Sequence, residues 1–281
     1  MKKEELREFY RISEAAFEED CVFNDVTSSS FTSQRIIKAR IKTKEKCLLC
    51  GVKLVKLLFL KRDRKVKVKL LKKDADSLNA GDAICEITGP AVSVLSVERI
   101  ALNFLSFLSA IATTTDNLKK VVSKYWKSHP KPILLDTRKT VPGMRYLSKY
   151  AVRCGGGKNH RMNLREIAMI KDNHIAAVGI DAVLKKIRRR KVIIEADNLR
   201  TAEKILKGKP YVLLCDNFTP LMVSRAIKLK ERISPATLIE ISGGINEKSV
   251  KKYANLSVSR ISAGSLTHSA GSIDFSLEVF S

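Results

Sequence analysis

From about residue 133 onward, short apolar runs alternate with longer segments whose apolar residues recur at helical spacing. Buried strands that alternate with amphipathic helices are typical of βα units around a parallel sheet. We expect strands at residues 133–135, 167–170, 192–194, 212–215, 238–241 and 260–262, and helices at 182–190, 199–208, 220–232 and 247–256. The pattern predicts an α/β fold with a β/α barrel in the second half of the chain.

Charged or small residues lie where these predicted strands end, at positions Asp136, Lys171, Glu195, Asp216 and Ser242, with Gly264 near the end of the last strand. One aspartate after a strand is usually a turn or helix-capping residue. Three successive predicted strands end at a lysine, a glutamate and an aspartate. Solvation alone does not explain this pattern, because it would place charged residues at both ends of the strands. The C-terminal ends of barrel strands converge on the catalytic face. The sequence therefore predicts a polar site there.

The first half of the chain has a different pattern. Strands are expected at 36–41, 66–70 and 83–87, followed by a helix over residues 97–112 that is apolar on more than one face. The length of 281 residues, of which 44% are hydrophobic, suits a barrel and a smaller domain. We place the domain boundary near residue 112.

The chain is strongly basic, with a formal net charge of +24. Such a charge attracts nucleic acid, an acidic membrane or an anionic small substrate. The lysine-rich run at residues 61–73 alternates with Val and Leu, which favours a solvated strand face over a binding stripe. An RNA-binding protein is the alternative, but aromatic content is only 6% and neither an RNP-type segment nor a zinc finger is visible.

The six cysteines are scattered, which favours reduced thiols. Cys47 and Cys50 form a single Cys-x-x-Cys without a second pair, so two buried thiols are favoured over half a zinc site. The first residues lack a signal-like apolar segment, and the apolar stretch at 48–60 is interrupted by Lys53 and Lys56. We expect a soluble cytoplasmic protein.

Two basic clusters follow in the chain. In DTRKTVPGMR (136–145), Arg138 and Lys139 come directly after a strand, and adjacent cations repel each other unless an anion lies between them. A planar Arg suits a carboxylate, and a Lys suits a phosphate. In RCGGGKNHR (153–161), three glycines allow close approach to a ligand and precede His160 and Arg161. Both clusters predict an anion pocket.

Two late-strand loops, SGG (242–244) and AGSLTH (263–268), match the place of the phosphate site in many barrels. The first is expected to lead through Asn246 into a helix whose N-terminal amides face an anion. Glu195 and Asp216 lie on the same predicted face. Magnesium held partly by substrate phosphates needs one or two protein carboxylates, although the pair could also only neutralise nearby lysines.

The chain resembles the quinolinate phosphoribosyltransferases over nearly its whole length. The matching segments are NDVTS (24–28), GDAICEITGPA (81–91), ERIALNFLSFLSAIATTT (98–115), DTRKTVPGMR, YAVRCGGGKNHR (150–161), IKDNH (170–174), LLCDNF (213–218), SGGIN (242–246) and LTHSAGSIDFSL (266–277). So many ordered matches are far more specific than a lone glycine motif.

The resemblance implies an incomplete β/α barrel over residues 113–268, beside a smaller α/β sandwich domain over residues 1–112 that the tail 269–281 joins. It also implies transfer of phosphoribose from phosphoribosyl pyrophosphate (PRPP) to quinolinate with decarboxylation, Mg²⁺ as cofactor, and a homodimer or larger assembly without nucleic-acid or membrane partners.

The resemblance also assigns roles to residues of this chain. Arg99 would enter the neighbouring subunit's site, and Arg138, His160 and Arg161 would hold the quinolinate carboxylates. Lys139 and Lys171 would face PRPP, and Glu195 and Asp216 would lie near ribose and Mg²⁺. The residues expected around phosphate are Ser242, Gly243, Gly244, Gly264 and His268.

Two departures from the family pattern stand out. Many members carry a further Glu two residues before Glu195, where this chain has Ile193, and Ala110 replaces a usual glycine. A paralogue of the molybdenum-operon type, acting on another aromatic acid, is the alternative within the fold. Such a relative is expected to lose part of the set Arg99, Arg138, His160 and Arg161, which this chain keeps.

Overall fold

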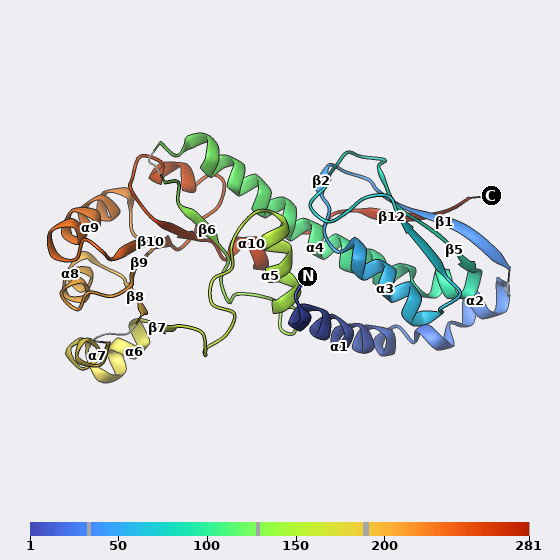
Figure 1. Cartoon of the computed structure of the whole chain (residues 1–281), viewed down its shortest axis with the longest axis horizontal. Helices are drawn as coiled ribbons and strands as arrows, with labels where there is room; N and C mark the ends of the chain where they lie inside the picture. The colour runs from blue at the N-terminus through green and yellow to red at the C-terminus, as the bar shows by residue number, and fades with distance from the viewer. Residues whose placement is uncertain (33–34, 128–129, 188–190, 281) are drawn as a thin grey trace. The chain divides into compact units, whose positions relative to one another are not determined.

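The computed structural model describes residues 1–32, 35–127, 130–187 and 191–280. The chain divides into two compact units. Residues 1–116, 140–156 and 269–281 form the first unit, and residues 117–139 and 157–268 form the second (Figure 1).

Six parallel strands form the sheet of the second unit, in the order β6-β11-β10-β9-β8-β7. They are β6 (Ile133–Leu135), β7 (Ala168–Ile170), β8 (Val192–Ala196), β9 (Val212–Asp216), β10 (Leu238–Ser242) and β11 (Arg260–Ser262). All six predicted strands are therefore confirmed. Within the described part of the chain, β6 and β7 pair with one neighbour each and not with each other. The sheet is an incomplete barrel, open between its two edge strands.

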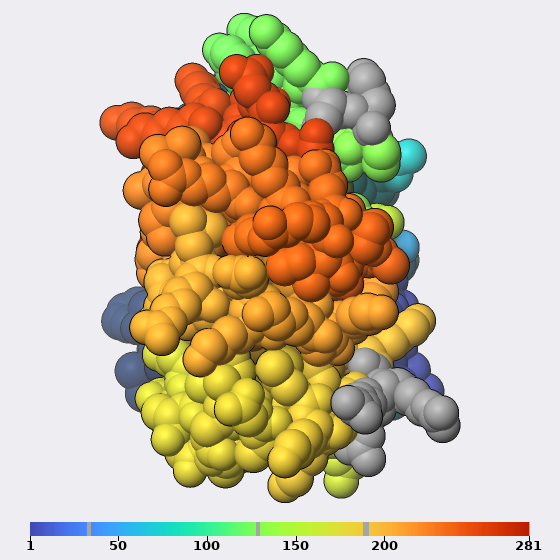
Figure 2. Space-filling model, turned by 90° about the vertical axis from the view of Figure 1, so that its left-hand side faces the viewer, coloured from blue at the N-terminus to red at the C-terminus, as the bar shows by residue number. Residues whose placement is uncertain are grey.

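Helices follow most of these strands and form the outer surface seen in Figure 2, from yellow to orange in chain order. They are α6 (Asp172–Val178), α7 (Ile180–Ile187), α8 (Leu199–Lys207) and α9 (Pro220–Ile233). A short helix, α10 (Ser265–His268), follows β11, and its Leu266 and Thr267 are buried. The Asn198 side chain accepts the Thr201 amide at 2.8 Å and so caps α8. Thr219 caps α9 in the same way, and Pro220 occupies its first helical position. Part of the predicted helix 182–190, residues 188–190, lies outside the described residues.

The predicted helix at 247–256 is wrong. The structure has one 3₁₀ turn there, η2 (Val250–Tyr253). The Asn246 Oδ1 atom accepts the amides of Lys248 and Ser249 at 2.9 and 3.0 Å. Such local side-chain bonds compete with helix formation. The helix N-terminus that was expected to face an anion after Asn246 is therefore not formed.

The first unit contains a four-stranded antiparallel sheet in the order β12-β1-β5-β3. The strands are β1 (Ile36–Thr43), β3 (Lys67–Leu70), β5 (Ala83–Pro90) and β12 (Phe275–Phe280), and a small second sheet pairs β2 (Cys47–Leu48) with β4 (Ser77–Leu78). In β1, Ala39 and Ile41 are fully buried while Lys38 is exposed, so one face of the sheet is the core face. The C-terminal tail enters this sheet because β12 pairs with β1.

The helices of the first unit are α1 (Lys3–Glu19), α2 (Val26–Phe31), α3 (Val52–Arg62), α5 (Arg145–Cys154) and most of α4 (Ala91–Tyr125), and a 3₁₀ turn, η1 (Val22–Asn24), lies between α1 and α2. The predicted helix 97–112 is the middle of α4, which is longer because no glycine or proline interrupts residues 91–125. By length and composition alone α4 could cross a membrane, but 61% of its apolar window is buried within the structure, as in a core helix.

One segment assigned by sequence to the barrel domain belongs to the first unit. Residues 140–156, which contain α5, pack against α1. Arg153 forms an ion pair with Glu5 at 2.5 Å, and the Tyr150 hydroxyl donates to Asp74 at 2.5 Å. The compact units therefore differ from the domains expected from the sequence, which divide near residue 112: α4 remains in the first unit as far as Asp116, and residues 140–156 join that unit.

Candidate active site

Residues at or just after the C-terminal ends of the six strands of the second unit line one cavity of about 520 Å³. Lys139 after β6 and Lys171 after β7 both reach it, so the sheet curves around the cavity from one edge to the other. The predicted site residues in its lining are Arg138, Lys139, His160, Arg161, Lys171, Glu195, Asp216, Ser242, Gly243, Gly244, Gly264 and His268. The C-terminal face of the barrel therefore brings together twelve predicted site residues, which come from strand ends, from the loops after them and from the segment before β7.

Two arginines form the most charged part of the cavity. Arg161 is 9% exposed, and burial together with the nearby Arg138 charge holds its pKa below the usual value. The Nη1 atom of Arg161 donates to the Ile167 carbonyl at 3.2 Å. The Nε atoms of Arg138 and Arg161 are buried and, among the described residues, have no hydrogen-bond partner. Two like charges with unused donors favour an anion between them.

The acidic residues lie on neighbouring strands. Glu195 at the end of β8 is 9% exposed and forms an ion pair with the Lys171 ammonium group. Asp216 at the end of β9 accepts a hydrogen bond from the Asn217 side chain at 2.9 Å. Both carboxylates line the cavity. Within the described residues, no group of three or more His, Cys, Asp and Glu could hold a metal ion, so an ion bound here would need ligands from a substrate.

The loop after β10 approaches the loop after β9 closely. Gly243 has φ +91°, and a Cβ atom there would lie 2.1 Å from Asn217 Oδ1 and 2.7 Å from the Asn217 nitrogen. The Asn217 amide donates to the Ser242 carbonyl at 2.9 Å, with Asn217 itself at φ 55°. Gly243 is therefore required both by its backbone conformation and by the space that Asn217 occupies.

Lys139 is held beside the last loop. The Thr267 hydroxyl donates to the Lys139 carbonyl at 2.7 Å. A Cβ atom on Gly264 would lie 3.1 Å from both Lys139 Cδ and His268 Nε2. Gly264 thus leaves room for a lysine and a histidine side by side, which is an arrangement suited to phosphate oxygens.

Arg99 and Arg153 are not part of this cavity. Arg99 is exposed on α4 in the first unit and does not line it. Arg153 is also in the first unit, where it is paired with Glu5. The glycine-rich cluster at 153–161 therefore contributes His160 and Arg161 to the cavity, and its first arginine is structural.

Sequence reasoning missed several residues around the cavity. Met169 and Leu214 line its wall, and the Asn217 side chain donates a hydrogen bond to the Asp216 carboxylate. Glu240 lies on β10 two residues before Ser242, in the middle of a predicted apolar strand. A charged residue there was a readable signal, because positions two apart share one face of a strand. Ile193 is 1% exposed and packs with Val212 and Leu214.

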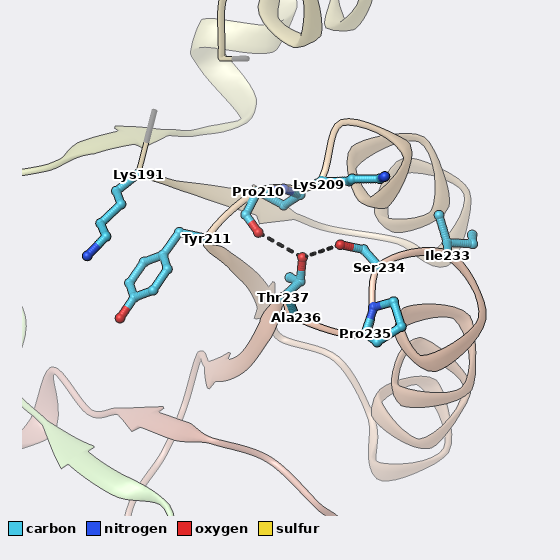
Figure 3. Close-up of a pocket in the computed structure, with 9 residues that line it drawn as sticks. All are labelled: Lys191, Lys209, Pro210, Tyr211, Ile233, Ser234, Pro235, Ala236 and Thr237. Carbon is cyan, nitrogen blue, oxygen red and sulfur yellow. Dashed lines mark hydrogen bonds between the residues drawn. The ribbon is translucent and has the colours of Figure 1, made fainter. Parts of the chain in front are cut away.

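A second depression, of about 470 Å³, lies at the opposite ends of the strands, next to the starts of β8, β9 and β10 (Figure 3). Its polar groups bind one another: Thr237 donates to the Pro210 carbonyl at 2.7 Å and contacts Ser234 at 2.7 Å. Lys191 lies 5.5 Å from the ring centre of Tyr211. None of the predicted site residues lines this depression, and its arrangement is that of a packed loop junction.

Comparison with known proteins agrees with this geometry. The model of the quinolinate phosphoribosyl transferase N-terminal domain matches residues 25–109, and that of the C-terminal domain matches residues 111–278. A Methanocaldococcus jannaschii protein described as a probable nicotinate-nucleotide pyrophosphorylase (carboxylating) is 36% identical over 279 residues, covering 96% of each chain.

Solved structures agree as well. A nicotinate-nucleotide pyrophosphorylase from Ehrlichia chaffeensis is 30% identical, with a TM-score of 0.89 and coverage of 97% of this chain and 98% of that one. NadC from Streptococcus pyogenes is 34% identical, with a TM-score of 0.87 and 96% coverage of both chains. The chain belongs to the quinolinate phosphoribosyltransferase family.

Proposed function

We propose that this protein transfers the phosphoribosyl group of PRPP to quinolinate and releases pyrophosphate and CO₂, giving nicotinate mononucleotide for NAD synthesis. The observation that carries this proposal is the pair Arg138 and Arg161, whose buried Nε donors have no partner among the described residues. Two adjacent arginines match a substrate with two adjacent carboxylates. Family membership supports the same reaction.

In this proposal the cavity has two sides. Arg138 and Arg161 bind the quinolinate carboxylates, with His160 beside them. The opposite side binds PRPP, with Lys139 and Lys171 facing its phosphates. The groups proposed around the phosphates are Ser242, Gly243, Gly244, Gly264 and His268. The closeness of Gly264, Lys139 and His268 supports this placement.

Magnesium is the proposed cofactor, held by Glu195, Asp216 and the phosphates of PRPP. Two carboxylates at one cavity fit a metal that takes its other ligands from substrate and water. When bound, Mg²⁺ would neutralise charge on the pyrophosphate. Glu195 is already paired with Lys171, so the same carboxylate also orients that lysine toward the cavity.

The residues then act by position and charge. Lys139 and Lys171 stabilise the departing pyrophosphate, while the nearby carboxylates support the positive character that develops on the ribose carbon. The ring nitrogen of quinolinate attacks that carbon. The alkylated nitrogen, now positive, stabilises the carbanion left when the adjacent carboxylate departs as CO₂. That carbon then takes a proton from water to give nicotinate mononucleotide. No protein nucleophile is needed, because the cavity holds both reactants in place.

We propose that two subunits share each active site through Arg99. This residue is exposed on α4 and lies outside the cavity lining of its own chain. In a homodimer it would enter the partner's cavity. Arg99→Ala and Lys139→Ala proteins, each inactive alone, are expected to regain activity when mixed, because one of the mixed sites is intact. Activity is measured after subunit exchange has been demonstrated by labelled chains. Exchange without any recovery contradicts a shared site.

The reaction is tested by incubating the protein with quinolinate, PRPP and Mg²⁺ and measuring CO₂ and nicotinate mononucleotide. Nicotinate replaces quinolinate in the control and should give no product. Chelation of Mg²⁺ is expected to stop the reaction and its readdition to restore it. Turnover of nicotinate but not quinolinate would contradict the proposal. We further propose that the protein is soluble and acts in the cytoplasm.

A further inference from the structure

Three polar side chains are in contact inside the barrel, below the level of Ser242. Glu240 on β10 is fully buried. Its Oε2 atom lies 2.8 Å from Arg260 Nε, and its Oε1 atom lies 3.3 Å from His160 Nε2. Glu240 and Arg260 are register partners on the neighbouring strands β10 and β11. A buried carboxylate needs such partners, because an unpaired charge in a protein interior is costly.

His160 connects this ion pair to the cavity. Its Nδ1 atom accepts the main-chain amide of Arg161 at 2.8 Å. A ring nitrogen that accepts a hydrogen bond carries no proton, so the proton of the neutral ring is on Nε2, which faces Glu240. The amide of His160 itself donates to Asp136 Oδ1 at 2.9 Å. The ring and the main chain at 160–161 are therefore held from two directions.

The carboxylate of Glu240 lies between two nitrogens, one on Arg260 and one on His160. Arg260 already balances the carboxylate of Glu240, so the ring does not have to be charged to stabilise it. The contribution of His160 in this arrangement is orientation: it fixes the peptide that carries Arg161, whose side chain is bonded at only one of its nitrogens in the described contacts.

We propose that Glu240 and Arg260 are positioning residues for the carboxylate-binding side of the cavity, acting through the ring of His160 on Arg161. Neither side chain lines the cavity, so neither touches the substrate. Such supporting contacts around ligand-binding residues fix ring orientation and tautomer. The identity of the ligand rests on the proposed function, whereas the proton position on His160 does not.

The proton position is tested first, on the full-length protein without substrates. Selective ¹⁵N labelling of histidine gives two ring-nitrogen signals for each of the four histidines, and a His160→Asn protein identifies those of His160. A neutral ring protonated at Nε2 is the expected result. A ring protonated at Nδ1 would overturn the inference, whatever reaction the protein catalyses.

The positioning role is tested with a Glu240→Leu/Arg260→Met protein, which removes both buried charges together so that neither is left unpaired. The KM for quinolinate is expected to rise about 10- to 100-fold, the usual cost of losing a supporting partner, while the KM for PRPP stays within about twofold. If the double variant does not fold, a Glu240→Gln protein, which keeps the side-chain shape, takes its place. The KM for quinolinate is again expected to rise, and the KM for PRPP is not.

Thr237→Val is the matched control. It removes a buried hydrogen bond to the Pro210 carbonyl just before β10, at the end of the strands away from the cavity (Figure 3). It should lower the unfolding midpoint and leave both KM values unchanged.

Unchanged quinolinate KM in a folded Glu240 variant, or an equal rise for both substrates, would overturn the positioning role. If the unaltered protein turns over no quinolinate, the proposed function fails and the NMR result still decides the arrangement of His160.

Discussion

Replacing Arg138 with alanine is expected to weaken quinolinate binding by about 2–5 kcal/mol, because truncation leaves a buried substrate carboxylate without its partner. Isothermal titration measures the loss. In the unliganded protein the same change removes a cation next to Arg161, whose pKa is held down by burial and by Arg138. The unfolding midpoint without ligand should therefore not fall, so the loss of binding cannot be a loss of folding.

Arg165→Ala is the matched control for this experiment. Arg165 is an exposed arginine in the same unit and does not line the cavity. Its removal changes the net charge by the same amount and should leave quinolinate affinity unchanged. Equal affinities of the Arg138→Ala and Arg165→Ala proteins for quinolinate would remove Arg138 from the binding site.

The second large effect is expected for Gly243→Ala. A non-glycine residue at φ +91° costs about 1–3 kcal/mol in free energy of unfolding. The added methyl group would also meet Asn217 Oδ1 at 2.1 Å, so the loops after β9 and β10 have to move apart. Urea unfolding should show a loss at or above this range. The KM for PRPP should rise, because Asp216 and the SGG loop lose their mutual position.

Gly244→Ala separates the two causes of the stability loss. Gly244 also has positive φ, +58°, but a Cβ atom there would meet nothing within 4 Å. Its alanine variant experiences the backbone strain without the collision, so it should lose less stability than Gly243→Ala. Equal losses in urea would show that the contact with Asn217 does not matter.

Much of the second unit was predictable because its signals are local. Strand positions follow from short apolar runs, and a polar residue lies at or near the end of the strand, as Glu195 does in β8 and Asp216 in β9. The strand-end rule for barrels then places those residues on one face. The turn at Val250–Tyr253 was missed because the side chains of Asn246 and Ser249 use local hydrogen bonds that periodicity does not reveal.

The division into units was less predictable. Residues 140–156 follow a barrel strand in sequence, and only their contacts with α1, including the ion pair of Arg153 with Glu5, assign them to the first unit. Those partners are 148 residues apart in the chain. The length of α4 was underestimated because its C-terminal end, residues 113–125, carries fewer apolar residues than its middle, although nothing in residues 91–125 breaks a helix.

The sequence by itself determined the order of strands and helices and the chemical character of the cavity. The first depends on the spacing of apolar residues within short segments, and the second on the residue types at the strand ends. Only the tertiary structure decided which of those residues touch. Strand order places Glu240 beside Arg260 and below His160, and the close approach of two loops makes Gly243 depend on Asn217. The reason is that register and loop contact are set by packing between segments far apart in the chain, and no local pattern encodes them.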